Sequence, residues 1–244
     1  MKRKRGGSPL YLQVRNEIRK KIETGEYAPG TAIPSEKKLA EHYGIHRLSV
    51  RIALEALLRE GLLKSSQGKG VYVCGPKTQR NPKTVLSGFR HGLEERGKSA
   101  ESHLLIKAER NAGPYYAKLL QVSPEDSIWY IRRIDSIDGQ AVALEDIYIP
   151  GSKLPGLQEI DIQMFSIYDA FSWSDIHVFR GKQILRITYL DPSMARLLGL
   201  TAKQPVMEES YLLQDETGDP VAFSRCYLRA EKAEYSVQLG TVPK

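Results

Sequence analysis

Apolar residues in the first 75 positions recur at helical spacing. A first helix is expected to begin at Pro9, because Ser8 is a suitable N-cap and apolar residues recur at positions 10, 14, 18 and 22. A second helix is expected from Ser35, another suitable N-cap, to position 43, because Gly44 is a typical C-terminal stop.

A third helix is expected over RLSVRIALEALLREGLL, which begins at position 47. Its apolar residues fall on one helical face, which should pack against the first two helices. Arg47, Leu48 and Arg51 fall on another face, since residues three and four apart are neighbours on a helix.

A β-hairpin is predicted directly after these helices. Two short predicted strands, 62–64 and 71–73, flank the polar sequence SSQGKG, which supplies a glycine-rich tip. Three helices and such a hairpin form a winged helix-turn-helix, whose third helix enters the major groove of DNA. Glycine at the tip lets the main chain approach phosphates closely, and Lys69 adds positive charge. We therefore assign residues 1–75 to a DNA-binding domain.

The remainder of the chain mixes strands and helices. Residues 76–84 are polar and contain prolines at positions 76 and 82, which indicates a linker. Residues 85–244 form the second predicted domain, with strands at 128–134, 142–149, 182–189 and 207–213 and helices at 88–96, 114–120, 166–172 and 192–198.

The second domain also repeats itself. The sequence AKLLQVSPEDSIWYIRRI (117–134) resembles ARLLGLTAKQPVMEESYL (195–212), and each copy is followed by a glycine turn and a further strand. Two such halves predict one antiparallel sheet with pseudo-twofold symmetry, helices on one face and a cavity between the halves. Chance matching of apolar residues is the alternative explanation. The expected fold class is α+β.

Charge is distributed unevenly between the two parts. The whole chain has a net charge of +7, and residues 1–75 contain 15 basic and 7 acidic residues, so the remainder is nearly neutral. This asymmetry favours a polyanion-binding head over a merely solubilising basic face. No apolar stretch approaches the length of a membrane span, no signal peptide is recognisable, and Cys74 and Cys226 lie far apart. We expect a cytoplasmic protein with reduced thiols.

The sequence resembles a known family over nearly its whole length. The run from PLYLQVRNEIRKK through PSEKKLAEHYGIHRLSVRIALEALLREGLL to SSQGKGVYV resembles the DNA-binding domain of GntR-type bacterial transcriptional regulators. The segments LSGFRHGLEERG, ALEDIYIP, SIYDAF, ARLLGL and PVAFSRCYLR resemble the UTRA effector-binding domain of the HutC subfamily, whose fold is like that of chorismate lyase.

The resemblance implies two sets of site residues. In the head it implies DNA contacts from the start of the second helix, the recognition helix and the wing: Ser35, Lys37, Arg47, Leu48, Ser49, Arg51, Gln67, Gly68, Lys69 and Gly70. In the second domain it implies that Ser87, Gly88, Phe89, Arg90, Arg133, Asp135, Glu145, Ser166, Tyr168 and Arg180 bind an anionic effector. The alternative for Arg47 and Arg51 is an exposed helix face without a DNA contact. The alternative for Arg133 is a surface ion pair with Glu145 or Asp146.

Four positions depart from the family pattern. Lys37 replaces an arginine, and His46 stands where a serine or threonine usually caps the recognition helix, so we expect a weaker cap. Asp135 stands where binders of amino-sugar phosphates carry a second arginine, and Ala222 replaces a glutamate. Asp135 is therefore either a solvated strand residue or a partner for an amine on the ligand.

The function expected from the resemblance is sequence-specific transcriptional regulation. A homodimer would bind a palindromic operator and act as a repressor that a phosphorylated sugar or sugar-amine metabolite releases, with no cofactor, no metal and no membrane partner. The alternatives are a chorismate lyase-like enzyme with an appended head and an architectural DNA binder. Against the enzyme, the five histidines show no metal-ligand spacing, and no phosphate-binding loop is present.

Overall fold

The computed structural model describes residues 9–66, 68–76 and 100–233. The chain divides into two compact units. The first contains residues 1–80 together with 156–175, and the second contains residues 81–155 and 176–244. The helix expected at 88–96 lies outside the described residues. None of the helices within the described ranges is long and apolar enough to cross a membrane.

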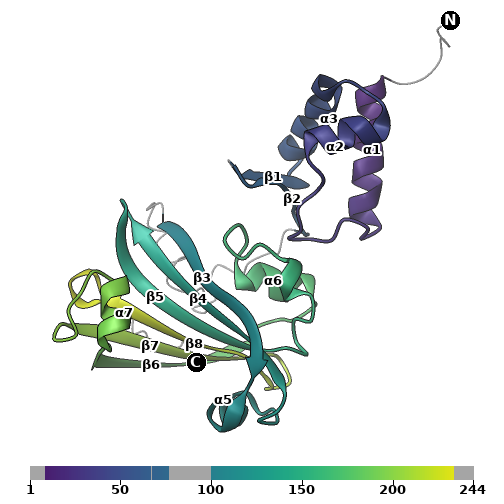
Figure 1. The fold of residues 1–244 in the computed structure, drawn as a ribbon. Coiled ribbons are helices and arrows are strands. Elements are labelled where there is room, and N and C mark those ends of the chain that lie inside the picture. The colour runs from purple at the N-terminus through teal and green to yellow at the C-terminus, as the bar shows by residue number, and fades with distance from the viewer. Residues whose placement is uncertain (1–8, 67, 77–99, 234–244) are drawn as a thin grey trace, which may run out of the picture. The chain divides into compact units, whose positions relative to one another are not determined.

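The N-terminal part of the first unit is a winged helix-turn-helix (Figure 1). Its elements are α1 (Leu10–Glu23), α2 (Glu36–Tyr43), α3 (Arg47–Arg59), β1 (Leu63–Ser66) and β2 (Gly70–Val73). One apolar core joins them, with Ile18, Val50 and Leu57 fully buried. The predicted helices and hairpin are confirmed. Helix α1 begins at Leu10 with Pro9 as its N-cap, so the proline lies one position outside the helix rather than inside it.

The segment 156–175 forms the rest of the first unit. It contains the short helix η1 (Leu157–Glu159) and α6 (Ile167–Trp173). Gly30, with a φ of +82°, lies against this segment, because a Cβ atom there would come within 2.8 Å of side-chain atoms of Ile160 and Trp173. Only glycine combines this left-handed backbone with so close an approach.

The second unit is built on a six-stranded antiparallel sheet with the order β3-β4-β5-β8-β7-β6. Its elements are β3 (Ala100–Asn111), α5 (Gly113–Leu120), β4 (Ser127–Ile137), β5 (Gln140–Pro150), β6 (Arg180–Tyr189), α7 (Pro192–Leu197), β7 (Pro205–Gln214), β8 (Pro220–Arg229) and η2 (Ala230–Lys232). The half β3-α5-β4-β5 corresponds in order to β6-α7-β7-β8, and the two meet at the antiparallel pair β5–β8. This arrangement confirms the predicted internal repeat. Strand β3 was not predicted.

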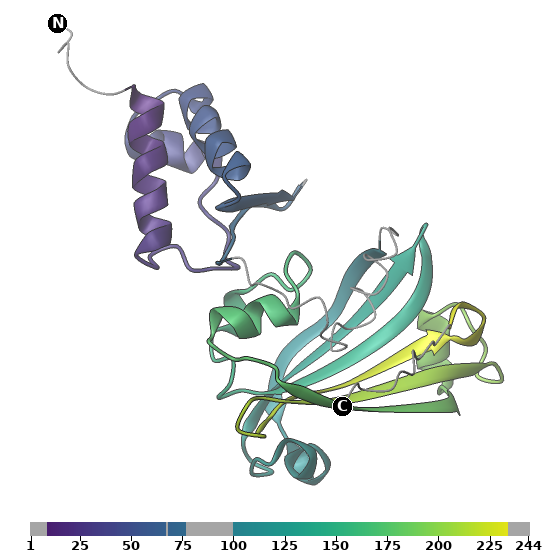
Figure 2. The ribbon, with the colours of Figure 1, turned by 180° about the vertical axis from the view of Figure 1, so that it is seen from behind.

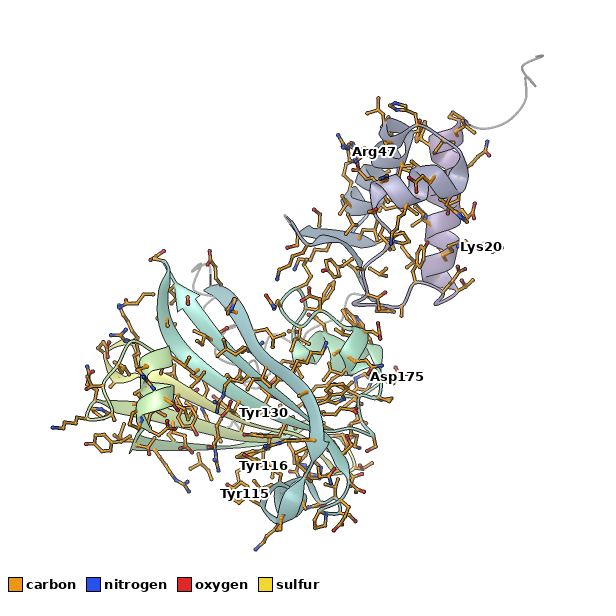
Figure 3. All side chains as sticks on the ribbon, viewed as in Figure 1. Lys20, Arg47, Tyr115, Tyr116, Tyr130 and Asp175 are labelled. Atoms are coloured by element: carbon orange, nitrogen blue, oxygen red, sulfur yellow. The ribbon has the colours of Figure 1, made fainter. Side chains whose placement is uncertain are left out.

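Both α5 and α7 pack on the same face of this sheet, as predicted. Helix α7 packs on Leu144 and Tyr227, and lies in front of the strands in Figure 1 and behind them in Figure 2. Tyr116 of α5 stacks on Tyr148 of β5, which stacks in turn on Tyr130 of β4, with ring centroids 3.9 and 5.1 Å apart. Figure 3 labels Tyr116 and Tyr130. Because helices cover this face, a ligand site on the sheet is expected on the other face.

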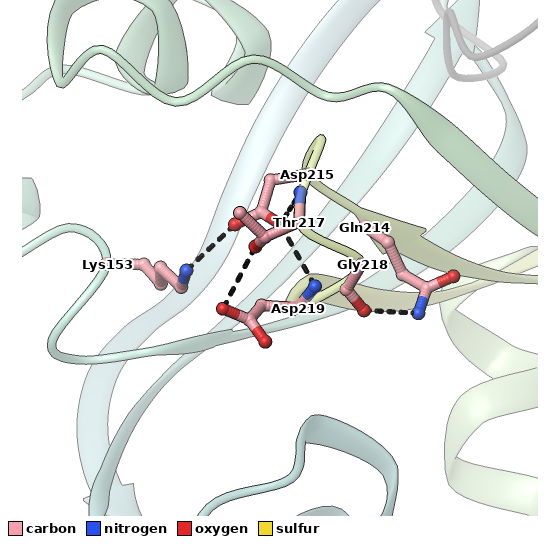
Figure 4. A network of polar contacts seen from close by, with 6 residues as sticks. All are labelled: Lys153, Gln214, Asp215, Thr217, Gly218 and Asp219. Atoms are coloured by element: carbon pink, nitrogen blue, oxygen red, sulfur yellow. Dashed lines mark hydrogen bonds and ion pairs between the residues drawn. The ribbon is translucent and has the colours of Figure 1, made fainter.

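The turn between β7 and β8 is fixed by a polar network (Figure 4). The carboxylate of Asp215 accepts hydrogen bonds from the Thr217 hydroxyl (2.7 Å), the Asp219 amide (2.9 Å) and the Lys153 ammonium (3.0 Å). The Thr217 hydroxyl and Lys153 lower the pKa of Asp215 to about 2, since they favour its charged form. Gly218 supplies the positive φ, +93°, that completes the turn.

Candidate DNA-binding surface and candidate effector site

The N-terminal part of α3 presents the predicted recognition residues. The three exposed residues are Arg47, which is labelled in Figure 3, Leu48 and Arg51. The accessible fraction of Leu48 is 58%, which is unusually high for a leucine. His46 is the N-cap, and its Nδ1 accepts a hydrogen bond from the Leu48 amide at 3.2 Å. The imidazole therefore caps this helix in place of a hydroxyl. An exposed apolar side chain between two arginines suits contact with a thymine methyl beside guanine edges.

Glu36 holds both arginines and was missed in the sequence analysis. Its carboxylate accepts two hydrogen bonds from Arg51, at 3.0 and 2.9 Å, and lies 3.6 Å from the Arg47 guanidinium. The hydrogen bond from Arg51 lowers the pKa of Glu36, so the carboxylate stays charged. The signal was present in the motif PSE, because Ser35 caps α2 through the Lys38 amide and thereby makes Glu36 the first helical residue. The neighbouring Lys37 is exposed.

The wing tip combines glycine with a lysine. Gly68 and Gly70 have φ values of +75° and +117°, and no heavy atom of the described residues lies within 4 Å of the position of an added Cβ atom at either. Lys69 is exposed and donates a hydrogen bond to Gln163 Oε1 at 2.6 Å. Gln67 lies outside the described residues. Ser49 is half-buried in α3, one position before the core residue Val50.

The sheet face opposite α5 and α7 carries a buried ionic row. Arg133 on β4 lies opposite Glu145 on β5, which lies opposite Cys226 on β8, which lies opposite Glu209 on β7. Arg133 Nε donates to Glu145 Oε2 at 2.7 Å, and both residues are less than 10% exposed. The predicted pair exists, but it is buried rather than a surface ion pair.

Burial and charge act against each other in this row. Burial opposes a charge on Arg133, but the carboxylates of Glu145 and Asp135 outweigh it and raise the pKa of the guanidinium. Burial raises the pKa of Glu145, and Arg133 counteracts that shift. Burial also raises the pKa values of the Cys226 thiol and of Glu209, which accepts a hydrogen bond from the Tyr211 hydroxyl at 3.1 Å. The row therefore holds a guanidinium among acidic groups whose charged forms are destabilised by burial.

Asp135 lies one row further along the same face. It is only 1% exposed, so the interpretation as a solvated strand residue is wrong. Its strand partners are Ser102 on β3 and Ala143 on β5. Neither carboxylate oxygen of Asp135 has a hydrogen-bond partner among the residues that the structure describes.

The remaining predicted effector residues belong to several elements of both units, and some lie outside the described ranges. Arg180 is exposed at the start of the edge strand β6, five positions before Leu185, the β6 residue in the row of Arg133. Ser166 belongs to the first unit and caps α6 in a capping box with Asp169. Tyr168, on α6, has its ring in edge contact with Phe171. Ala222 is buried in β8. Residues 87–90 lie outside the described residues.

The opposite face carries a second ion pair built from the neighbouring residues. Arg132 donates to both oxygens of Asp146, at 2.6 and 2.7 Å, and the Tyr130 hydroxyl adds a third hydrogen bond at 3.1 Å. Each Asp146 oxygen therefore has a partner. This pair serves as an internal reference for a buried carboxylate whose charge is compensated.

A winged helix-turn-helix joined to a sheet domain with a buried ionic site defines a DNA-binding transcriptional regulator. The chain belongs to the GntR family of regulators with a UTRA domain. Residues 10–73 match the model described as bacterial regulatory proteins, gntR family, and residues 95–234 match the UTRA domain. The resemblance stated from the sequence is thus confirmed.

Relatives align with this chain over most of their length. The chain is 31% identical to the transcriptional repressor NagR of Bacillus subtilis over 82% of both chains. It is 29% identical to the mannosyl-D-glycerate transport/metabolism system repressor MngR of Escherichia coli, over 84% of this chain and 85% of that one. It is similar in fold to PhnF from Mycobacterium smegmatis, with a TM-score of 0.61, 23% identity and coverage of 94% of this chain and all of that one.

Proposed function

We propose that the protein is a repressor that a small anionic metabolite, a phosphorylated sugar or a sugar-amine adduct, releases from its operator. The observation that carries this proposal is the buried guanidinium of Arg133, on the face of β4 and β5 opposite the helices. Its pair with Glu145 occupies Nε and one terminal nitrogen, whereas a guanidinium has five N–H donors in a fork that suits phosphate and carboxylate groups. The names of relatives support a sugar-derived compound: MngR is named for mannosyl-D-glycerate, and a probable repressor in Escherichia coli is named for fructoselysine utilisation.

In this proposal the head reads DNA as part of a homodimer. Two recognition helices bind the half-sites of a palindromic operator, one helical turn or a multiple of it apart. Arg47 and Arg51 read base edges, Leu48 contacts a thymine methyl, and Lys69 binds phosphate. Effector binding in the second domain weakens DNA binding, and by linkage operator DNA weakens effector binding by the same factor.

The test is operator binding by the purified full-length protein at fixed salt. Fluorescence anisotropy measures its affinity for labelled DNA from upstream of its own gene and for a scrambled duplex, each with and without a panel of phosphorylated sugars and sugar–amino acid adducts. We expect a specific complex that one compound class dissociates. Equal affinity for both duplexes would refute the regulator, and chorismate turnover in the same preparation would favour the enzyme. A specific complex that no compound releases would refute the effector class.

A further inference from the structure

Asp135 is a buried carboxylate that lacks a direct partner in the described part of the chain. Neither of its oxygens accepts a hydrogen bond there, although the residue is only 1% exposed. An unsatisfied buried polar group destabilises a folded protein, and the effect is larger when the group is charged. Ser102, its cross-strand neighbour on β3, also has a buried Oγ without a partner among the described residues. Two adjacent buried polar groups therefore both lack a hydrogen-bond partner among the described residues.

The charges around Asp135 favour a cation as its missing partner. On this face of the sheet, Arg133 is the guanidinium beside Asp135, and it donates its hydrogen bond to Glu145. Glu209 adds another buried carboxylate two strands beyond Glu145. On this face of the sheet, within the described ranges, three buried carboxylates (Asp135, Glu145 and Glu209) therefore share one buried guanidinium.

The other face shows how the same sheet compensates a carboxylate permanently. Asp146 accepts hydrogen bonds from Arg132 on both of its oxygens and one more from the Tyr130 hydroxyl. No group of this kind meets Asp135 in the part of the chain that the structure describes. The difference between two acids of one sheet points to a ligand group as the missing partner.

We infer that Asp135 and Ser102 form a subsite for an ammonium group on the effector. This inference rests on the proposed function and adds the ligand class: a sugar phosphate that carries a primary or secondary amine. Directly opposed residues on antiparallel strands have Cβ atoms about 5 Å apart, so one ammonium between them reaches both the carboxylate and the hydroxyl. An ammonium supplies two or three N–H donors for these acceptors. A neutral hydroxyl in the same place adds no positive charge to balance the three carboxylates that share Arg133.

The first experiment measures the stability of the full-length protein without ligand. Replacing Asp135 with asparagine keeps its shape and removes its charge, so we expect Asp135→Asn to raise the Tm of the second domain by about 2–8 °C. Asp138→Asn is the matched control and should leave Tm unchanged, because Asp138 is exposed in the turn directly after β4 and asparagine tolerates its positive φ. A lower Tm for Asp135→Asn would mean that the carboxylate is structurally paired and would overturn the inference.

The second experiment measures selectivity with two matched pairs of probes. Calorimetry compares glucosamine 6-phosphate with glucose 6-phosphate, and fructoselysine 6-phosphate with fructose 6-phosphate. In at least one pair the wild type should prefer the amine by about 10-fold or more, and Asp135→Asn should reduce that preference to within about 3-fold. Ser102→Ala should weaken the binding of the amine probe more than the binding of the matched neutral probe.

The outcomes separate this inference from the proposed function. Equal binding of amine and neutral probes, with operator release by both, would overturn the ammonium subsite and leave the anion-responsive repressor standing. Binding of no probe, with a specific operator complex intact, would count against the sugar phosphate effector. In that case the Tm of Asp135→Asn without ligand is decisive: a higher Tm than the wild type supports a carboxylate without a partner, and a lower Tm overturns the inference.

Discussion

Breaking the Arg133–Glu145 pair from one side tests how the ionic row is held. Arg133→Met retains much of the length of the side chain and leaves Glu145, which is 7% exposed, without its guanidinium. Removing one partner of a buried pair costs about 3–5 kcal/mol, because the remaining charge stays buried. For a domain of this size each kcal/mol shifts Tm by about 2–4 °C, so we expect a decrease of about 6–20 °C.

The double variant Arg133→Met/Glu145→Gln removes both charges and should recover most of this loss. Replacing a buried pair on both sides is often neutral or stabilising. The sequence contains two tryptophans, Trp129 in β4 and Trp173 in α6. In a Trp173→Phe background, tryptophan fluorescence during unfolding therefore reports on the sheet alone. A double variant as unstable as the single one, or a single variant that loses less than about 1 kcal/mol, would refute the reasoning.

The pH dependence of the single variant has a defined sign. Burial already raises the pKa of Glu145, and Arg133 counteracts that shift, so losing Arg133 raises the pKa further. A carboxyl with a higher pKa in the folded than in the unfolded state contributes stability below its unfolded pKa and loses it as pH rises through its folded pKa. Arg133→Met should therefore lose less stability at pH 5 than at pH 8. The double variant, which lacks the carboxyl, should show no such difference.

Three further predictions concern the DNA surface and the hairpin turn. Arg51→Ala should weaken binding to the operator by about 5- to 150-fold and binding to scrambled DNA far less. The control Arg59→Ala, at the C-terminal end of α3, should change neither affinity. If anisotropy shows an unchanged ratio of operator affinity to scrambled-DNA affinity for Arg51→Ala, Arg51 does not read a base. Glu36→Gln should tighten binding to scrambled DNA and lower the operator preference, because both arginines lose their common partner; a preserved preference at several salt concentrations would contradict this role. Because the pKa of Asp215 is lowered to about 2, the stability that its carboxylate contributes is present above the unfolded pKa and is lost as pH falls below about 4. The loss should be at most about 1 kcal/mol, because the carboxylate lies in a surface turn. If the stability of Asp215→Asn falls as steeply with acid as that of the wild type, Asp215 does not contribute this stability.

The head could be predicted well because its signals are local. Apolar spacing located three helices, glycine located their ends and the hairpin tip, and the serine before Glu36 located the start of α2. Strand β3 was missed because it lacks such a signal. It is an edge strand, largely exposed, with a register shift between Leu104 and Ile106, so its residues show no regular alternation of apolar and polar positions.

The burial of the charged row could not be predicted from local pattern. Strand β5 is buried along nearly its whole length, including the adjacent acids Glu145 and Asp146. Two consecutive charged residues in a strand suggest that at least one faces solvent, since side chains alternate between faces. Both are buried here because the partner charges come from β4, 12 and 14 residues earlier in the chain. That pairing depends on strand register, which the hydrophobic pattern of a doubly buried strand does not specify.

The dipeptides Arg132-Arg133 and Glu145-Asp146 produce two sites with different chemistry from the same ingredients. Because neighbouring strand residues point to opposite faces, one arginine and one acid go to each side of the sheet. On the helix-covered side the ion pair is closed by two hydrogen bonds between charged groups and one from a tyrosine, which suits a structural role. On the other side Asp135 adds a carboxylate that the described residues leave without a partner. A buried carboxylate without a hydrogen-bond partner is retained in a native structure, despite its cost in stability, when a ligand supplies the partner. This difference between the two faces makes Asp135 informative about the effector.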